Sequence, residues 1–327
     1  MKNLNSLLLA AGMSASMAPA LVQAADSAKF PSKLVTIIVP YTAASGSDIL
    51  ARILAPKLSA RWGQSVIVDN KPGASGNIGA HKVATAAPDG YTLLLTTNTF
   101  TMTPALNKSM PFDTVADFSP VVKLAETGFT MAVNPSVPAK DMPSLIAYIK
   151  KSAGKINYAT PGSGTTQHLA MELFKSQYGL DVLHVPYKGL QGAVTDLIGG
   201  QVQMMVSTVG SMTSLAQGGK VRMLGVTGQT RNSLAPEVPT FKEQGISGMD
   251  NVDVWYAVLA PAHTPPELVE RLNKDFVEVL NMPDIKAQLE KLGLSVRTDT
   301  PAQLGALVKS DMARWQKVVT NAGITAN

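Results

Sequence analysis

The sequence of 327 residues contains no cysteine. That excludes disulfide bonds, and it also excludes anchoring through a lipid-modified N-terminal cysteine. An exported protein without disulfides depends on its hydrophobic core for stability, and a chain of about 300 residues is long enough to build a large core. A chain of this length is also more typical of two lobes than of one.

The sequence has little excess charge of either sign. It carries 28 Lys and Arg against 23 Asp and Glu, a formal net charge of +5 with histidine neutral, and these residues are scattered along the chain. Proteins that bind nucleic acid usually gather basic and aromatic residues into one face or run. We therefore expect no nucleic-acid partner, although a slightly positive field helps to attract anions.

Motifs for catalysis and for nucleotide binding are also missing. The sequence has no G-x-x-x-x-G-K-[ST] and no G-x-S-x-G, and Gly162-x-Gly164 lacks the third glycine and the acidic partner of a dinucleotide fingerprint. The four histidines lie far apart and never at metal-ligand spacing: His81, His168, His184 and His263. We therefore predict no catalytic residue, no cofactor and no metal.

Residues 1–24 have the features of a secretory signal peptide. Lys2 precedes an apolar stretch from Leu7 to Ala20, and Val22-Gln23-Ala24 fits a small-x-small cleavage site. The alternative is a membrane anchor, but the stretch is too short and too rich in Ala, Ser and Gly to span a bilayer. No later stretch approaches the roughly 20 apolar residues that a span requires. We predict export to the periplasm with cleavage after Ala24.

Hydrophobic strands alternate with amphipathic helices along the rest of the chain. The order strand, helix, strand, helix, strand is typical of a parallel sheet covered by helices. We expect strands at 35–39, 66–68, 91–96, 121–124, 129–133, 156–159, 182–185, 202–206, 221–226 and 254–260. We expect helices at 48–62, 76–86, 143–152, 167–178, 191–198, 265–280, 283–292 and 301–322. Pro56 predicts a kink or a break in the first of these helices.

Two α/β units of similar plan, followed by a helical tail, predict an α/β fold with two lobes. The chain would cross to the second lobe near residue 125 and return near residue 250. Lobe 1 is then discontinuous, with residues 25–125 and 250–327, and lobe 2 contains residues 126–249. Ligands of open α/β sheets bind outside the carboxyl ends of the strands, so we expect a site between the lobes.

Two loops rich in Gly, Ser and Thr each join a hydrophobic strand to a helix. Such a loop directs backbone N–H groups at the positive end of a helix dipole, which suits an anion. Pro40 to Asp48 forms one loop, and Ala159 to Thr166 forms the other. Their candidate ligand-binding residues are Tyr41, Thr42, Ser45, Gly46, Ser47 and Asp48 on the first loop and Gly162, Ser163, Gly164, Thr165 and Thr166 on the second.

Further candidates lie at the ends of neighbouring strands: Thr97, Asn98, His168 and Tyr187. Asp48 has two interpretations, as an acid that helps to start its helix or as a group that meets an amine, a hydroxyl or a water of the ligand. His168 either caps and packs its helix or takes part in catalysis, although no nucleophile motif accompanies it. Lys188 is the fixed cation of these loops, so a bound carboxylate would rely mainly on backbone N–H groups and hydroxyls.

Taken together, the motifs make the chain similar to the Bug (TctC-like) family, the periplasmic substrate-binding proteins of tripartite tricarboxylate transporters. The matching segments spread over nearly the whole mature chain: residues 40–52, 69–76, 88–93, 162–169, 184–189, 224–227 with Arg231, 236–240 and 260–265. The resemblance implies a two-lobed periplasmic binding protein of type II, or Venus-flytrap, architecture. It also implies that the protein captures a small carboxylate and delivers it to membrane permease subunits, and we expect a monomer.

In this family, a ligand carboxylate is held between the two loops, largely through backbone groups and ordered water. The resemblance carries this role over to the residues from Tyr41 to Asp48 and from Gly162 to Thr166. It also points to Ser207, which follows the strand ending at Val206, because family members often have an acidic residue near this position. They often have two glycines where this chain has Ser45-Gly46, so the identity of the ligand is not carried over.

Two other functions remain open at this point. The same fold would serve a sensor that presents its ligand to a signalling partner in the membrane. An exported enzyme, such as a transferase that holds phosphate in its Gly-rich loops, is disfavoured because a nucleophile–base motif and a metal cluster are missing.

Overall fold

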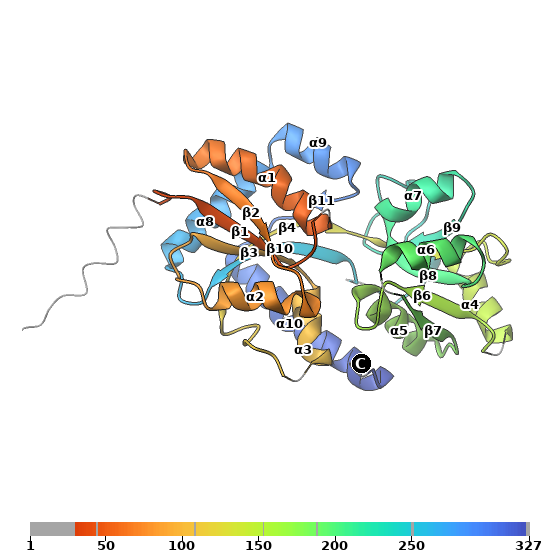
Figure 1. Ribbon diagram of the computed structural model, residues 1–327. Coiled ribbons are helices and arrows are strands. Elements are labelled where there is room, and N and C mark those ends of the chain that lie inside the picture. The colour runs from red at the N-terminus through yellow and green to blue at the C-terminus, as the bar shows by residue number, and fades with distance from the viewer. Residues whose placement is uncertain are drawn as a thin grey trace, which may run out of the picture.

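The computed structural model describes residues 30–43, 45–107, 109–152, 154–187, 189–249 and 252–324. The predicted signal peptide lies outside these residues, and so do Ala44 and Lys188. The chain forms two bodies side by side, and each body is an open sheet with helices against its faces (Figure 1).

The first body is built on a sheet of six strands in the order β11-β4-β10-β3-β1-β2. β1 (Val35–Val39) pairs in parallel with β2 (Val66–Asn70) and with β3 (Thr92–Thr97). β10 (Val254–Pro261) is antiparallel to both β3 and β4 (Phe118–Thr127), and the short β11 (Ser295–Val296) extends the edge beside β4.

The helices of the first body come from both ends of the chain. They are α1 (Gly46–Trp62), α2 (Asn77–Ala84) after a short 3-10 turn η2 (Ala74–Gly76), α3 (Thr99–Leu106), α8 (Pro266–Leu280), α9 (Pro283–Lys291) and α10 (Pro301–Ala322). β1 is buried along nearly its whole length because α1 packs on one face of the sheet and α2 on the other. This agrees with the continuous apolar run that its sequence carries.

The second body is built on a sheet of five strands in the order β7-β6-β8-β5-β9. β6 (Asn157–Thr160) is parallel to β7 (Leu183–Pro186) and β8 (Met204–Thr208), whereas β5 (Phe129–Val133) is antiparallel to β8 and β9 (Arg222–Val226). Its helices are α4 (Met142–Lys151), α5 (Thr166–Tyr178), α6 (Leu190–Ile198) and α7 (Val209–Gln217), and a 3-10 turn η3 (Lys242–Gln244) follows.

The chain changes sheet between Thr127, the last residue of β4, and Phe129, the first residue of β5. It returns to the first sheet at Val254, the first residue of β10. The first body is therefore discontinuous in sequence, and two connections join the bodies. The α/β fold with two sheets confirms the predicted fold class.

The predicted strands and helices are confirmed with ends that move by a few residues, but three elements were missed. These are α3, α7 and β11. The expectation of a break at Pro56 is wrong, because α1 continues as one helix through this residue. Pro56 lies on the exposed side of α1, where water can solvate the carbonyl that its missing N–H leaves unpaired.

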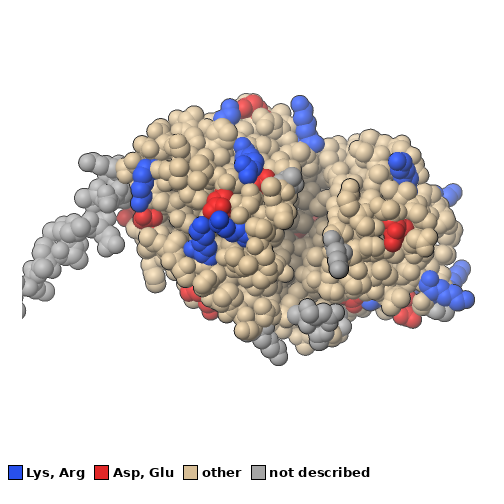
Figure 2. All heavy atoms as spheres, viewed as in Figure 1, with Lys and Arg blue, Asp and Glu red and all other residues tan. Residues whose placement is uncertain are grey.

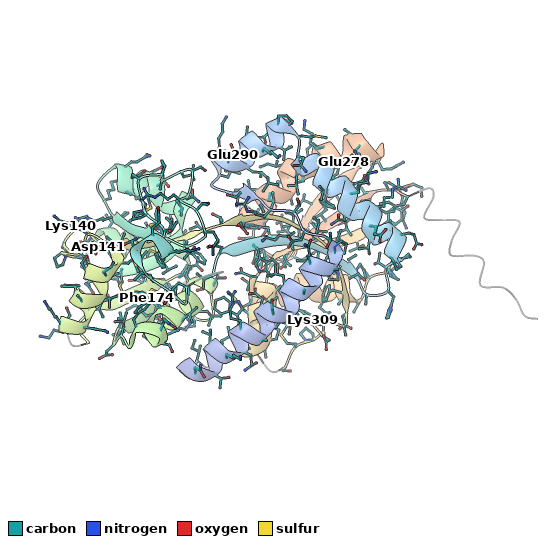
Figure 3. All side chains as sticks on the ribbon, turned by 180° about the vertical axis from the view of Figure 1, so that it is seen from behind. Lys140, Asp141, Phe174, Glu278, Glu290 and Lys309 are labelled. Carbon is teal, nitrogen blue, oxygen red and sulfur yellow. The ribbon has the colours of Figure 1, made fainter. Side chains whose placement is uncertain are left out.

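The long helix α10 connects the two bodies on the face opposite to that of Figure 1. Figure 3 shows it running from the first body, where Lys309 is labelled, towards α5, which carries Phe174. The apolar core is continuous through both bodies, and Trp315 of α10 and Phe174 of α5 are fully buried in it. None of the described helices is long and apolar enough to cross a membrane.

Candidate functional site

A furrow separates the two bodies on the face shown in Figure 2, and charged side chains are scattered around it. A cavity of about 360 Å³ lies between the bodies. It is lined by Gly46, Ile49, Thr127, Thr208, Gly210, Ser211, Leu234, Tyr256, Lys291, Leu292 and Leu294. These residues come from the starts of α1 and α7, the end of β4, β10, the end of α9 with the segment that follows it, and the segment between β9 and η3.

The start of α1 supplies the first of the two predicted loops. Ser45 is the N-cap of α1, and its Oγ accepts a hydrogen bond from the Asp48 N–H at 3.3 Å. This bond satisfies one N–H group of the first turn of α1, as the preference for Ser at N-caps predicts. Gly46 lines the cavity, and a Cβ at this position would lie 2.6 Å from the Tyr256 hydroxyl. A glycine is therefore required for this close approach.

Asp48 is buried, with 3% of its surface exposed. The Arg52 Nε donates to its two carboxylate oxygens at 3.0 and 3.1 Å, and the Asn70 Nδ2 donates to its Oδ1 at 3.0 Å. The same Asn70 amide donates to the Tyr41 carbonyl at 3.1 Å. Asp48 thus ties the first loop to α1 and β2, which favours the interpretation as a structural acid over the one as a ligand contact.

Side chains at the end of β3 hold the first loop from the other side. The Tyr41 hydroxyl lies 3.0 Å from the Thr97 Oγ1, and Thr97 is almost fully buried. Asn98 is completely buried, and its Nδ2 donates to the Asp253 carbonyl at 3.1 Å, where the chain returns to the first body. The side chains of Thr97 and Asn98 therefore join parts of the protein to one another. Thr42 is exposed, and Ser47 is buried.

The second predicted loop starts α5 and is held mainly by its own hydrogen bonds. Thr165 is the N-cap, and its Oγ1 accepts from the His168 N–H at 3.4 Å and donates to the Gly162 carbonyl at 2.8 Å. The Gly164 N–H donates to the His168 Nδ1 at 3.0 Å, so this N–H is already bonded within the loop. The sequence predicts that backbone N–H groups of this loop meet the ligand, but this one is bonded to the protein instead.

Gly164 also lies close to the first body. Its φ is +75°, and a Cβ here would lie 3.0 Å from the Cδ1 of Leu106 at the end of α3. The loop is therefore placed against α3, on a different side from the described cavity. Ser163 is exposed, and Thr166 begins α5 as a buried residue.

His168 packs against His184 with ring centroids 3.9 Å apart. Burial lowers the pKa of His168, and burial together with the neighbouring His168 lowers the pKa of His184 to about 4. Both rings are therefore neutral at pH 7, and neither supplies a positive charge for an anion. The Thr160 Oγ1 of β6 lies 2.7 Å from the His184 Nε2 of β7, which fixes the His184 ring against β6.

Tyr187 and Ser207 are also held by protein groups. The Tyr187 hydroxyl donates to the Asp196 Oδ2 at 2.5 Å, and burial with this bond raises the pKa of Tyr187 to about 12. The Ser207 Oγ lies 2.9 Å from the Ser211 Oγ at the start of α7. Ser207 does not line the cavity itself, but it contacts Ser211, which does.

The structure brings five polar residues to the cavity that are not among the sequence-predicted candidates: Thr127, Thr208, Ser211, Tyr256 and Lys291. Thr208 and Ser211 lie at the start of α7, a short helix that was not predicted. Tyr256 lies on β10, opposite Thr97 in the sheet. Because β10 is antiparallel to β3, its first residues lie beside the carboxyl end of β3, and a search of strand carboxyl ends overlooks them. Lys291 ends α9, and no local signal marks it.

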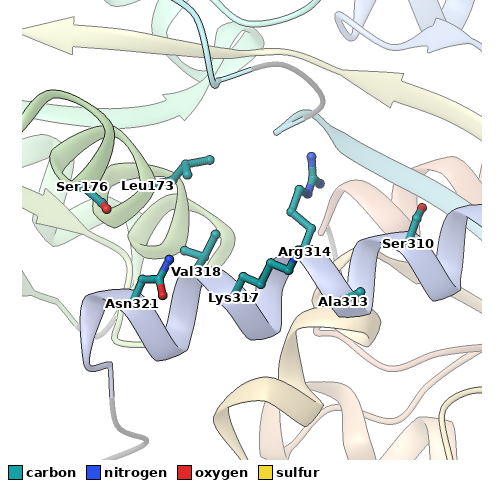
Figure 4. A pocket seen from close by; sticks show the side chains of 8 residues that line it. All are labelled: Leu173, Ser176, Ser310, Ala313, Arg314, Lys317, Val318 and Asn321. Atoms are coloured by element: carbon teal, nitrogen blue, oxygen red, sulfur yellow. The ribbon is translucent and has the colours of Figure 1, made fainter.

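Another hollow, of about 460 Å³, lies between α5 and α10 (Figure 4). Leu173 and Ser176 of α5 face residues along α10, including Arg314 and Val318. Its walls are the middles and ends of two helices, with no helix N-terminus and no strand end among them. It therefore lacks the loop and helix-start features that the sequence predicts for the site, although Arg314 and Lys317 are among its lining residues. Among the described residues, no group of three His, Asp or Glu is placed to hold a metal ion.

Comparisons with known proteins agree with this geometry. Residues 50–324 match the model of the tripartite tricarboxylate transporter family receptor, TctC. A relative from Pseudomonas sp. (strain P51), described as the UPF0065 protein in the tcbD-tcbE intergenic region, is 35% identical over 99% of this chain and 97% of its own.

Two solved structures extend the comparison to three dimensions. The structure of R. palustris Rpa4515 with adipate has a TM-score of 0.79 and 34% identity, over 90% of this chain and 99% of that one. The periplasmic binding protein BugD has a TM-score of 0.76 and 32% identity, over 91% of this chain and 100% of that one. The chain belongs to the tripartite tricarboxylate transporter receptor (TctC) family of periplasmic solute-binding proteins.

Proposed function

We propose that this protein captures a small carboxylate between its two bodies and delivers it to the membrane permease subunits of a tripartite tricarboxylate transporter. The observation that carries the proposal is the cavity between the bodies, which the starts of α1 and α7 line together. Helix N-termini favour negative charge, and two of them converge here from opposite bodies. The adipate in the Rpa4515 structure supports a small carboxylate as the ligand.

The two sheets suggest how the protein closes on its ligand. We propose residues 25–125 and 250–327 as lobe 1 and residues 126–249 as lobe 2, in agreement with the change of sheet after Thr127 and the return at Val254. The Cβ positions of Gly164 and Gly210 both lie close to the first body, at Leu106 and at the Leu292 carbonyl. Closure then brings the start of α7 and the second loop against lobe 1.

The proposed roles of the site residues differ between the two loops. Ser45, Gly46 and Ser47 present the first turn of α1 to the ligand, and Ser207 supports the start of α7. The residues from Gly162 to Thr166 shape lobe closure at α3, with His168 packed beneath them. Asp48, Thr97, Asn98 and Tyr187 hold these segments in place. The protein then acts as a receptor that releases its ligand unchanged.

Thermal unfolding with a broad panel of carboxylates tests the proposal. At about 100 times Kd, a bound carboxylate is expected to add about 2.7 kcal/mol to the free energy of unfolding, which raises Tm by several degrees. Mass spectrometry of the recovered ligand is expected to find it unchanged. If no carboxylate raises Tm and a phosphorylated or nucleotide ligand does, the protein is not a carboxylate receptor.

We further propose that the mature protein begins at Ala25 in the periplasm. Val22-Gln23-Ala24 provides the cleavage site, and the chain has no cysteine for lipid attachment. N-terminal sequencing of the protein from the periplasmic fraction is expected to start at Ala25. An intact Met1 in that fraction would contradict the proposal.

A further inference from the structure

Both connections between the bodies carry a carboxyl group. Glu126 is the residue before the last one of β4, where the chain leaves the first sheet, and Asp253 directly precedes β10, where the chain returns. β4 and β10 are antiparallel neighbours, so these two points lie side by side. Both carboxyl groups line a second cavity, of about 370 Å³, whose other wall is α10. This cavity is distinct from the one that the starts of α1 and α7 line.

The cations of this second cavity pair with carboxylates other than Asp253. The charged groups around Asp253 all belong to the first body: Lys123 and Glu126 of β4, Asp311 and Arg314 of α10, and Arg297 beside β11, which reaches Glu126 at 3.1 Å. The Lys123 Nζ lies 2.8 Å from Glu126, and Arg314 lies 2.5 Å from Asp311. Asp253 itself forms no ion pair with the described residues. Of these three carboxyl groups, Asp253 therefore has the least to stabilise its negative charge.

Asp253 also contacts both bodies. Its backbone carbonyl accepts from Asn98 of the first body, whereas its side chain accepts from the Thr227 hydroxyl of the second body. The same hydroxyl accepts from the Phe129 N–H at 2.8 Å, where the chain enters the second sheet. The backbone of Gly228 covers the other carboxyl oxygen, because a Cβ there would lie 3.3 Å from the Asp253 Oδ2. The second body thus brings a hydroxyl and peptide groups to this carboxyl group, and the first body brings the charges.

Rotation of one body against the other changes the surroundings of Asp253. Thr227 and Gly228 move with the second body, whereas the charged side chains stay with the first. When the bodies separate, water reaches the carboxyl group and hydration stabilises its ionised form. When they close, peptide groups replace this water, and a carboxyl group without an ion pair is then more stable when protonated. The raised pKa of Asp253, about 6 with burial as its main cause, agrees with this direction.

We propose that Asp253 is a proton-sensing group of the hinge, which takes up a proton when the bodies close on a ligand and releases it when they open. Low pH favours the state that binds the proton more tightly, which is the closed one. Ligand affinity therefore falls as pH rises from about 4 to about 6 and is constant above this window. The inference rests on the proposed function only in that a ligand closes the bodies, because Asp253 does not line the ligand cavity.

Calorimetric titration of the wild type and of Asp253→Asn at pH 4.5 and pH 7.5 tests the inference. The probe is the carboxylate that raises Tm most in the thermal panel. Its own carboxyl groups titrate equally with both proteins, so the ratio of the two affinities reports the hinge alone. Asparagine imitates the protonated carboxyl group at every pH. The variant is therefore expected to bind at least about fivefold more tightly than the wild type at pH 7.5, and within about twofold of it at pH 4.5.

Two further variants locate the effect. Glu126→Gln is expected to reduce the pH dependence of the affinity, because Lys123 is then released to stabilise the ionised Asp253. Asp284→Asn is the control, since its carboxylate pairs with Lys57 at 2.8 Å on the surface of the first body. Its affinity is expected to equal that of the wild type at both pH values.

The possible failures of the inference and of the proposed function are distinguishable. If the ratio of the Asp253→Asn affinity to the wild-type affinity is the same at pH 4.5 and pH 7.5, the inference is wrong and the proposed function is intact. If no carboxylate binds and a phosphorylated or nucleotide ligand does, the proposed function is wrong. The same ratio measured with that ligand then decides the inference, because the hinge responds to closure and not to the chemistry of the ligand.

Discussion

Replacing Gly164 with valine is expected to lower the affinity for the cognate carboxylate at least tenfold, which is about 1.4 kcal/mol. The φ of +75° is strongly disfavoured for a β-branched residue. A Cβ would also lie 3.0 Å from the Leu106 Cδ1, and a valine adds two methyl groups beyond it. Both effects would push the second loop away from α3 in the closed protein. They would also weaken the hydrogen bond from the Gly164 N–H to His168.

Gly179 offers a matched control for this substitution. It ends the same helix with a φ of +60°, but no atom lies within 4 Å of its Cβ position. Gly179→Val is therefore expected to lower Tm without changing affinity. If the contact with α3 matters, Leu106→Ala in the Gly164→Val background should restore part of the lost affinity. If calorimetric titration finds wild-type affinity in Gly164→Val, the second loop has no part in closing the protein on its ligand.

Replacing Asp253 with asparagine is expected to stabilise the protein above pH 6. Asp253 lies where the chain returns from the second body, and the Thr227 hydroxyl donates to its Oδ1. Burial raises the pKa of Asp253 to about 6, and the nearby Glu126 raises it further, whereas Thr227, Lys123 and Arg314 act in the opposite direction. Ionisation of this buried carboxylate therefore lowers the free energy of unfolding.

The sign of the pH dependence follows from this raised pKa. Between about pH 4 and pH 6 the folded state binds the proton more tightly than the unfolded state, so the wild-type protein loses stability as pH rises through this window. The rise of this pKa above its ordinary value corresponds to roughly 2–3 kcal/mol. An asparagine at this position does not titrate and still accepts the bond from Thr227, so the variant is expected to keep this stability at about pH 7.5.

Chemical denaturation of both proteins at pH 4.5 and pH 7.5 measures the difference. At pH 7.5 we expect Asp253→Asn to have a higher free energy of unfolding than the wild type, and we expect this difference to shrink towards pH 4.5. Asp284→Asn is the control, because its pairing with Lys57 lowers the pKa of Asp284. This second replacement is not expected to stabilise the protein at either pH. A gain of equal size at both pH values for Asp253→Asn would show that the charge is not the cause.

The candidate site could be predicted from the sequence only in part. Ser45 and Thr165 were expected on loops that lead into helices, and in the structure both are N-caps, a preference that depends on groups within one turn. Gly46 was expected at the site, and it lines the cavity. The Gly164 N–H was expected to face a ligand, but it bonds to His168, which lies only one helical turn away.

The sequence by itself determined the alternation of strands and helices, the division into two α/β units and the loops at the strand ends. These depend on local periodicity and on residues close together in the chain, such as the buried run Val35–Val39. Pro56 shows a limit even of local rules, because α1 continues through this exposed proline.

Only the tertiary structure decided which side chains meet between the bodies. The antiparallel insertion of β10 between β3 and β4 places Tyr256 opposite Thr97, and the return of the C-terminal helices brings Lys291 beside the start of α7. Strand register and the packing of one body on the other determine which residues far apart in sequence come together. No local preference of the chain encodes either of these, so the side chains that line the cavity are known only from the folded protein.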